Sequence, residues 1–164
     1  MTTAHTPATG AATGAGGATV WLTGLPSAGK STLARALARR LHAGARRVEV
    51  LDGDEIRAFL SAGLGFGRTD RHTNVQRIGF VAELLARNGV TALVPVIAPY
   101  ADSRDAVRAR HEANGTPCEL TGLTGVDDPY EEPVAPELRI RTQGRTVAAS
   151  AAELHTFLAE RGLA

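Results

Sequence analysis

Residues 24–31 carry small, cationic and hydroxyl side chains in a spacing that suits phosphate binding. The stretch reads GLPSAGKS, so Gly24, Gly29, Lys30 and Ser31 fit the pattern G-x-x-x-x-G-K-S. Glycines in such a loop let backbone N–H groups turn inward around a polyphosphate, and the start of a helix adds partial positive charge. Lys30 can place a compact ammonium between the β- and γ-phosphates, and the Ser31 hydroxyl can ligate Mg²⁺.

Lys30 is the only lysine in a chain that otherwise uses arginine for its positive charge. The planar fork of an arginine does not fit the space that a lysine ammonium occupies between phosphates, so the two are not interchangeable there. The alternative interpretation is a glycine-rich turn with a chance lysine. A GTPase-type switch is disfavoured, because its N-K-x-D guanine loop needs a second lysine. The stretch therefore favours a kinase-like phosphotransferase.

The loop needs a strand before it and a helix after it, and the pattern supplies both. Residues 18–24 form a short apolar run, and leucines recur at helical spacing from Lys30 until Gly44. Further strands are expected over 47–54, 90–100 and 137–142, and helices over 69–89, 102–115 and 146–162. Strands that alternate with helices predict an α/β fold with a parallel sheet of the P-loop NTPase type and helices on both faces.

Two carboxylates stand at the end of the second expected strand. Asp52 and Asp54 flank Gly53, at the edge where open α/β sheets bind ligands. Simple turn chemistry after a strand is the alternative for this D-G-D, more so for Asp52 than for Asp54.

Composition sets the outer limits. A formal net charge of +1 gives no reason to expect a nucleic-acid or membrane partner, and no apolar stretch is long enough to span a bilayer. A single cysteine, Cys118, cannot form an internal disulfide, which is compatible with a cytoplasmic protein. We expect residues 1–17, rich in Ala, Thr and Gly, to form a disordered tail, and residues 18–164 to form one kinase domain.

Beyond the phosphate loop, several blocks resemble one family, the adenylylsulfate (APS) kinases. They occur in the family's order and cover most of the chain from Trp21 to Pro133: GLPSAGKST, LDGDEIR, LGFGRTDRHTNVQRIG, VIAPYADSRDAVR and TGVDDPYEEP. The resemblance implies transfer of the ATP γ-phosphoryl group to the 3′-hydroxyl of adenylyl sulfate in sulfate assimilation, with Mg²⁺, and it allows a homodimer. It also implies an ATP-binding loop of Gly24, Leu25, Pro26, Ser27, Ala28, Gly29, Lys30, Ser31 and Thr32.

The same resemblance implies roles for residues outside the loop. Lys30 and Asp54 are the implied catalytic residues, with Asp54 as the general base that faces the acceptor hydroxyl. Ser31 and Asp52 belong to the implied magnesium site. Phe66 is expected to stack on the adenine of adenylyl sulfate, and arginine forks suit its phosphosulfate. The implied substrate-binding residues are Asp54, Arg57, Phe66, Arg71, Asn74 and Ile97.

Two departures from the family pattern qualify this expectation. Ala98 stands where many members have a serine that some of them phosphorylate, so the phosphoryl group must pass directly from ATP to the acceptor. In addition, GTPCEL runs straight into TGLTGVDDPYEEP, without the strand, helix and lid that separate them in relatives. We therefore expect a sheet one strand short beside 21–24, unless PCEL forms a stub or ELRIRT fills the place.

The missing lid leaves three functional hypotheses. The first is an adenylylsulfate kinase that closes poorly, since a lid excludes water and completes the charge around the phosphates. The second is a P-loop kinase for another small hydroxyl compound, which the LGFGRTDRHTN block disfavours. The third is a nucleotide-binding module with weak or no catalysis.

Overall fold

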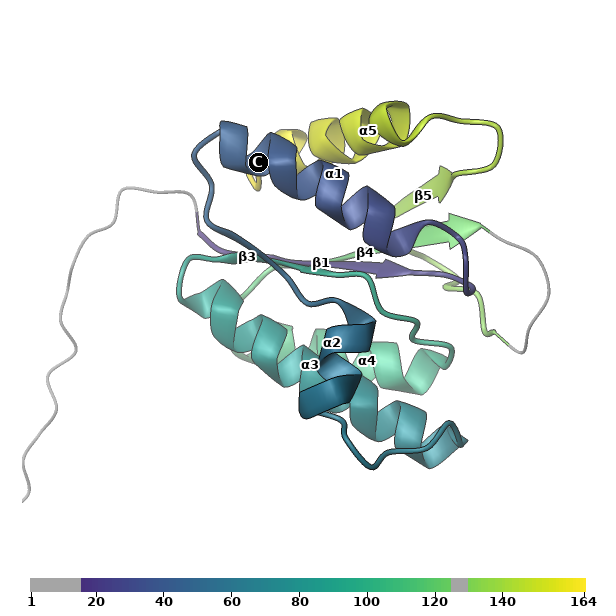
Figure 1. Ribbon diagram of the computed structural model, residues 1–164. Helices are drawn as coiled ribbons and strands as arrows, with labels where there is room; N and C mark the ends of the chain where they lie inside the picture. Colours follow the sequence, from purple (N-terminus) through teal and green to yellow (C-terminus); the bar gives the residue numbers. More distant parts are fainter. Residues whose placement is uncertain (1–15, 125–129) are drawn as a thin grey trace, which may run out of the picture.

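A computed structural model describes residues 16–124 and 130–164, and a parallel β-sheet forms its centre (Figure 1). Within these residues the strand order is β2-β3-β1-β4-β5, and every neighbouring pair is parallel. This confirms the predicted α/β class. The strands are β1 (Thr19–Thr23), β2 (Val48–Val50), β3 (Thr91–Val94), β4 (Cys118–Thr124) and β5 (Leu138–Arg141).

Helices cover both faces of the sheet, as Figure 1 shows. One face carries α1 (Lys30–Ala43) and α5 (Val147–Glu160), which pack against each other. The other face carries α3 (Arg68–Arg87) and α4 (Ala101–Ala113), with the short α2 (Gly53–Phe59) beside them. Right-handed crossovers account for this arrangement, because the chain moves one way along the sheet from β1 to β2 through α1 and the other way through α3 and α4.

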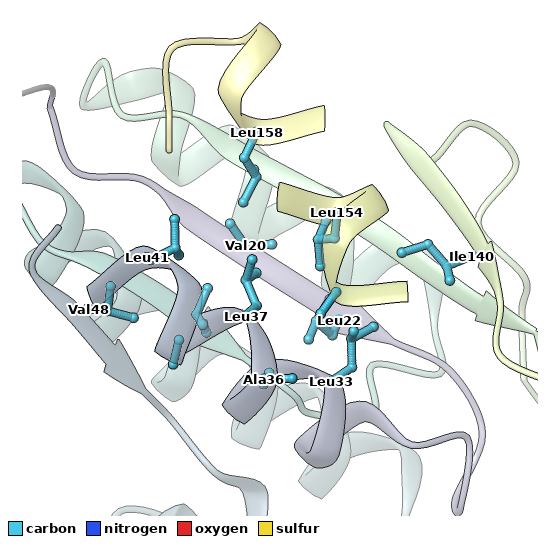
Figure 2. Close-up of a cluster of buried hydrophobic side chains, with 14 of the residues drawn as sticks. Val20, Leu22, Leu33, Ala36, Leu37, Leu41, Val48, Ile140, Leu154 and Leu158 are labelled. Carbon is cyan, nitrogen blue, oxygen red and sulfur yellow. The ribbon is translucent and has the colours of Figure 1, made fainter. Parts of the chain in front are cut away.

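Each face has its own apolar core, and the core under α1 holds the phosphate loop in place. Leucines of α1, spaced four residues apart, point at the sheet and meet side chains of β1 and α5 (Figure 2). Leu22, Leu37 and Leu154 are fully buried there. Burying one such side chain contributes about 1.5–3 kcal/mol, so the first turn of α1 is firmly attached to the end of β1.

The place beside β1 is filled, as expected for the alternative in which PCEL forms a stub, although the strand is longer than that stub. β4 pairs with β1 over five residues, from Thr19 opposite Cys118 to Thr23 opposite Gly122, and with β5 on its other side. The strand joins CEL to TGLT, the two segments on either side of the missing stretch. An empty place beside β1 would leave backbone N–H and C=O groups of β1 without hydrogen bonds, which costs free energy. TGLT extends the strand that begins at CEL, so that these groups are paired.

Two further boundaries differ from the sequence expectation. The third strand was expected over 90–100 but ends at Val94, because Pro95 has no N–H to donate to the sheet. Residues 95–100 instead continue as irregular backbone along the site. A helix, α2, follows Asp52 directly where only an acidic strand end was expected, and Asp52 is its N-cap.

The N-terminal segment is described only from Gly16 onward, so most of the expected tail over 1–17 lies outside the described residues. Gly17 is buried, and a Cβ there would come within 2.6 Å of the Val90 nitrogen. Among the described helices, none combines the length and the apolarity that crossing a membrane requires.

Candidate active site

The loop between β1 and α1 has the backbone of a phosphate-binding loop. Gly24 has φ +153°, and a Cβ there would lie 2.7 Å from the Leu123 carbonyl oxygen of β4, so only glycine fits. Gly29 adopts the left-handed conformation, φ 82°, as the N-cap of α1, and Ser27 also has a positive φ of 63°. These turns begin α1 at Lys30, at the strand–loop–helix junction that the sequence predicts.

The Lys30 ammonium lies inside the loop. Its Nζ donates hydrogen bonds to the carbonyl oxygens of Gly24 at 2.9 Å and Leu25 at 2.6 Å. Burial lowers the pKa of Lys30, because the partly enclosed ammonium has lost much of its hydration. The loop therefore holds one cation that lacks an anionic partner among the described residues, at the start of a helix. A polyphosphate would supply that partner.

Asp52 connects the two helices that border the cleft. Its Oδ1 accepts a hydrogen bond from the Asp54 N–H at 3.2 Å and so caps α2. Its Oδ2 lies 3.0 Å from Nη2 of Arg35, a residue of α1. The cap sets the direction of the first turn of α2, which carries Asp54.

A cleft of about 240 Å³ brings together the loop, the D-G-D segment and the acceptor residues predicted from sequence. β2, β3 and the start of α1 meet at this end of the sheet, where parallel sheets place ligands. The lining residues include Pro26, Lys30, Ser31, Asp52, Asp54, Arg57, Arg71, Asn74 and Ile97 from the predicted set. Gly24, Leu25, Ser27, Ala28, Gly29 and Thr32 do not line it and instead build the loop and its helix.

On the acceptor side, two arginines and a phenylalanine form one group. The Arg57 guanidinium lies 4.3 Å from the centroid of the Phe66 ring, and that of Arg71 lies 6.0 Å away. Arg71 Nε also donates to the Phe66 carbonyl at 2.8 Å. The Phe66 ring is 71% exposed and is not part of the cleft lining, so it borders the mouth.

Asn74 lies deeper in the cleft. Its side chain is buried, and its Oδ1 has no hydrogen-bond partner among the described residues. A buried amide oxygen without a partner is costly, and a ligand hydroxyl or amine would satisfy it.

Sequence reasoning missed several residues around the site. Pro95 and Val96, which follow β3, line the cleft wall. Arg35 pairs with Asp52 and follows Ser31 by one helical turn, a spacing that could have indicated a shared helix face. Tyr130 hydrogen-bonds to Thr23 Oγ1 at 3.0 Å, at the end of β1. The rest of the TGVDDPYEEP block includes residues 125–129, which lie outside the described residues.

The model of the adenylylsulphate kinase family matches residues 16–119 of the chain. The adenylyl-sulfate kinase of Rippkaea orientalis is 42% identical over 169 residues, which cover 89% of this chain and 93% of the relative. The adenylyl-sulfate kinase of Myxococcus xanthus is 44% identical, with coverage of 88% and 92%.

Solved structures agree. The APS kinase of Mycobacterium tuberculosis in complex with AMPPNP and APS has a TM-score of 0.82 and 33% identity, and the match covers 88% of this chain and 98% of that one. A hexameric APS kinase from Thiobacillus denitrificans has a TM-score of 0.82 and 44% identity, with coverage of 90% and 30%. A gluconokinase from Sinorhizobium meliloti shares the fold, with a TM-score of 0.62 and 17% identity.

Two further results concern the missing segment. The family match ends at residue 119, within β4, where the sequence passes from CEL to TGLT. The alignment to the Rippkaea relative runs over 169 residues but uses only 89% of this 164-residue chain, so the relative carries residues that have no counterpart here.

Proposed function

Because the chain belongs to the adenylylsulphate kinase family, we propose that it transfers the γ-phosphoryl group of ATP to the 3′-hydroxyl of adenylyl sulfate, giving 3′-phosphoadenylyl sulfate and ADP. The observation that carries this proposal is the single cleft that holds Lys30, Asp54, Arg57, Arg71 and Asn74. A generic nucleotide-binding loop would need only the first of these residues.

Lys30 is the proposed catalytic cation for the ATP phosphates. Its Nζ now rests on two loop carbonyls and needs only a short movement of a flexible side chain to meet the β- and γ-oxygens. Phosphates would give the partly buried ammonium an anionic partner and so stabilise its charged form. The positive charge of Lys30 would then lie next to the phosphate oxygens on which negative charge accumulates during transfer.

Asp54 is the proposed general base for the acceptor. It lies in the first turn of α2 and lines the same cleft as Lys30 and Ser31, so an acceptor hydroxyl there could lose its proton to the carboxylate while the hydroxyl oxygen attacks phosphorus. Ala98 is fully buried and has no hydroxyl, which supports direct in-line transfer without a phosphorylated residue.

Arg57, Phe66, Arg71, Asn74 and Ile97 are the proposed acceptor-binding residues. Two guanidinium groups at one side of the cleft suit the two anionic groups of a phosphosulfate. The exposed Phe66 ring at the mouth offers a surface on which an adenine could stack, and the vacant Asn74 Oδ1 could accept a hydrogen bond from the ligand.

Mg²⁺ would be held by Ser31 and Asp52 together with ATP phosphate oxygens. A hydroxyl and a carboxylate are oxygen donors of the kind that Mg²⁺ prefers, and both side chains line the cleft. When bound, the cation neutralises charge on the phosphates. The chain's own part is to keep the Asp52 carboxylate at the cleft edge, where the α2 cap and Arg35 hold it.

We propose the cytoplasm as the compartment, since ATP is supplied there, and self-association as a homodimer. Sedimentation velocity of the purified chain tests the assembly: a species of twice the chain mass supports the dimer, and a single species of chain mass contradicts it.

A turnover assay with two acceptors tests the proposed function. The purified chain is incubated with MgATP and either adenylyl sulfate or gluconate, and nucleotides are separated by anion exchange. We expect 3′-phosphoadenylyl sulfate only in the first mixture. Phosphorylation of gluconate instead would favour the sugar-kinase alternative. Calorimetric binding of ATP and adenylyl sulfate without any product would favour the nucleotide-binding module.

A further inference from the structure

An arginine outside the cleft holds one of the cleft carboxylates. Arg35 lies on α1, four residues after Ser31, and its Nη2 is 3.0 Å from Asp52 Oδ2. The Asp52 side chain is only 17% exposed, whereas that of Arg35 is 63% exposed. Asp52 lines the cleft, whereas Arg35 is not among its lining residues.

The other oxygen of the same carboxylate begins the helix that carries the proposed base. Asp52 Oδ1 accepts from the Asp54 N–H at 3.2 Å, as the N-cap of α2. Both oxygens therefore have a partner, one on α1 and one on α2. α1 is packed into the core that it shares with β1 and α5, whereas α2 is not. The Asp52 carboxylate therefore fixes the start of α2 relative to α1.

The other contacts of α2 lie beyond its first turn, such as those of Arg57 with the Leu64 and Gly65 carbonyls and the Phe66 ring. The helix is seven residues long, and none of its side chains is fully buried, although Ile56 packs partly against the core. Its far end is held by side-chain contacts such as Arg77 Nη1 to the Leu60 carbonyl at 2.8 Å. So short a helix is marginal by itself, and the cap at Asp52 accounts for much of the order of its first turn.

We propose that Arg35 is a positioning residue for phosphoryl transfer: by holding Asp52, it fixes the first turn of α2 and keeps the Asp54 carboxylate directed into the cleft. The proposal rests on the assigned role of Asp54 as base. An exposed ion pair normally contributes little to global stability, so this role predicts lost turnover without lost folding.

The first test compares Arg35→Met with Arg39→Met, a matched change at an exposed arginine one turn further along α1. We expect Arg35→Met to lower kcat by about tenfold, because a small misplacement of a reacting group is costly. The Tm should stay near the wild-type value. Arg35→Lys should recover part of kcat, and Arg39→Met should match the wild type. An unchanged kcat in Arg35→Met, or an equal loss in Arg39→Met, overturns the proposal.

The second test asks whether Arg35 acts through Asp52. In an Asp52→Asn background, Arg35→Met should cause almost no further loss of turnover, because the link it acts through is already broken. A full additional loss in that background would mean that Arg35 acts by another route, and the proposal would be wrong.

The third test needs no activity, and so separates this inference from the proposed function. Amide hydrogen exchange of residues 53–59 is measured on the ligand-free chain. Faster exchange there in Arg35→Met, with α1 unchanged, supports the positioning role even if the acceptor proved to be another compound. Exchange equal to that of the wild type contradicts it.

Discussion

At the scale of single residues, Lys30 is the side chain whose surroundings point most directly to phosphate binding. It is the only lysine, it is half-enclosed by the loop, and it donates to two backbone carbonyls rather than to a carboxylate. A structural lysine would pair with an acid. An ammonium that is hydrogen-bonded only to neutral carbonyls is better suited to bind an anionic ligand such as a polyphosphate.

Replacing Lys30 should abolish most phosphoryl transfer. We expect Lys30→Ala to lower kcat by about 10²-fold or more, the usual effect of losing one preorganised charge contact. Lys30→Arg should be nearly as poor, since the guanidinium does not fit between the phosphates. Steady-state kinetics at saturating ATP measure both, and thermal melts provide the folding control. An arginine variant with full activity would refute the point-charge argument.

Asp54→Asn should separate chemistry from nucleotide binding. The amide cannot take the acceptor proton, so we expect turnover to fall by about 10²–10⁴-fold. ATP affinity should hardly change, because Asp52 and Ser31, and not Asp54, are the proposed ligands of Mg²⁺. Calorimetry with AMPPNP, alongside the turnover assay, checks both parts. If ATP binding collapses while adenylyl sulfate binding persists, Asp54 belongs to the metal site.

At this scale, motif order predicted most of the side chains that line the cleft, but not Pro95 or Val96, and Phe66 lies outside the lining. The roles of these residues stay predictions. Motif order could not predict what each side chain touches before a ligand arrives. Phe66, expected to stack on an adenine, lies against the Arg57 guanidinium in the ligand-free chain. The spacing from Ser31 could indicate a shared helix face for Arg35, but its pairing with Asp52 depends on α1 and β2 lying side by side, which local sequence does not show.

At the scale of elements, β4 completes the sheet beside β1, and the sequence did not predict it in full. Its sequence, CELTGLT, mixes Glu119, Thr121 and Gly122 with few apolar residues, so neither alternation nor a continuous apolar run indicated a strand. Thr121 is fully buried, and Glu119 is mostly buried and lies 3.5 Å from Arg161. The segment forms a strand because the edge of β1 needs a hydrogen-bonding partner. The segment's own residue preferences do not account for it.

Restoring the missing element should improve coupling between ATP use and product. We expect a strand-and-lid segment from a relative, grafted between Cys118 and Glu119, to raise the ratio of transfer to hydrolysis. A lid would exclude water from the phosphates. This junction lies within β4, so the grafted strand must take over its pairing with β1 and β5.

The ratio of 3′-phosphoadenylyl sulfate to ADP measures the effect of the graft, with circular dichroism to check folding. A folded graft with an unchanged ratio would show that another part of the chain already closes the site in the native protein.

The whole molecule was easier to predict than its details. Helical spacing and buried apolar runs were sufficient for the α/β class and for most helices, because those signals reflect packing on a sheet. Strand ends were less predictable: Pro95 ended β3 early, and α2 depends on a cap at Asp52 more than on any apolar face.

A buried histidine should make the stability of the whole fold depend on pH. His111 is fully buried, with Nδ1 2.9 Å from the Val107 carbonyl and Nε2 2.8 Å from Thr19 Oγ1. Burial lowers the pKa of His111, with smaller opposing effects from the Val107 hydrogen bond and Glu83 and a further lowering by Arg110. The unfolded chain therefore takes up the proton at higher pH than the folded chain does.

The free energy of unfolding should therefore fall as the pH drops below about 6.5, the usual pKa of a histidine. Above that pH, His111 should not make the free energy of unfolding depend on pH. Urea denaturation from pH 8 to 5 measures this, with His111→Gln as the comparison. The variant should be less stable at pH 8 and should lose less stability on acidification. Parallel pH profiles for the two proteins would contradict the assignment.

The open phosphate site should also allow some ATP hydrolysis without an acceptor, so product formation alone is not the sharpest test. The most direct measurement follows the phosphoryl group itself. The chain is given adenylyl sulfate and Mg²⁺ with ATP that carries ¹⁸O in its γ-phosphoryl group, and products are examined by mass spectrometry and ³¹P NMR. We predict labelled phosphoryl on the 3′-oxygen of adenylyl sulfate, together with a smaller share in free phosphate. Label found only in free phosphate, with adenylyl sulfate bound but unmodified, would contradict the kinase assignment.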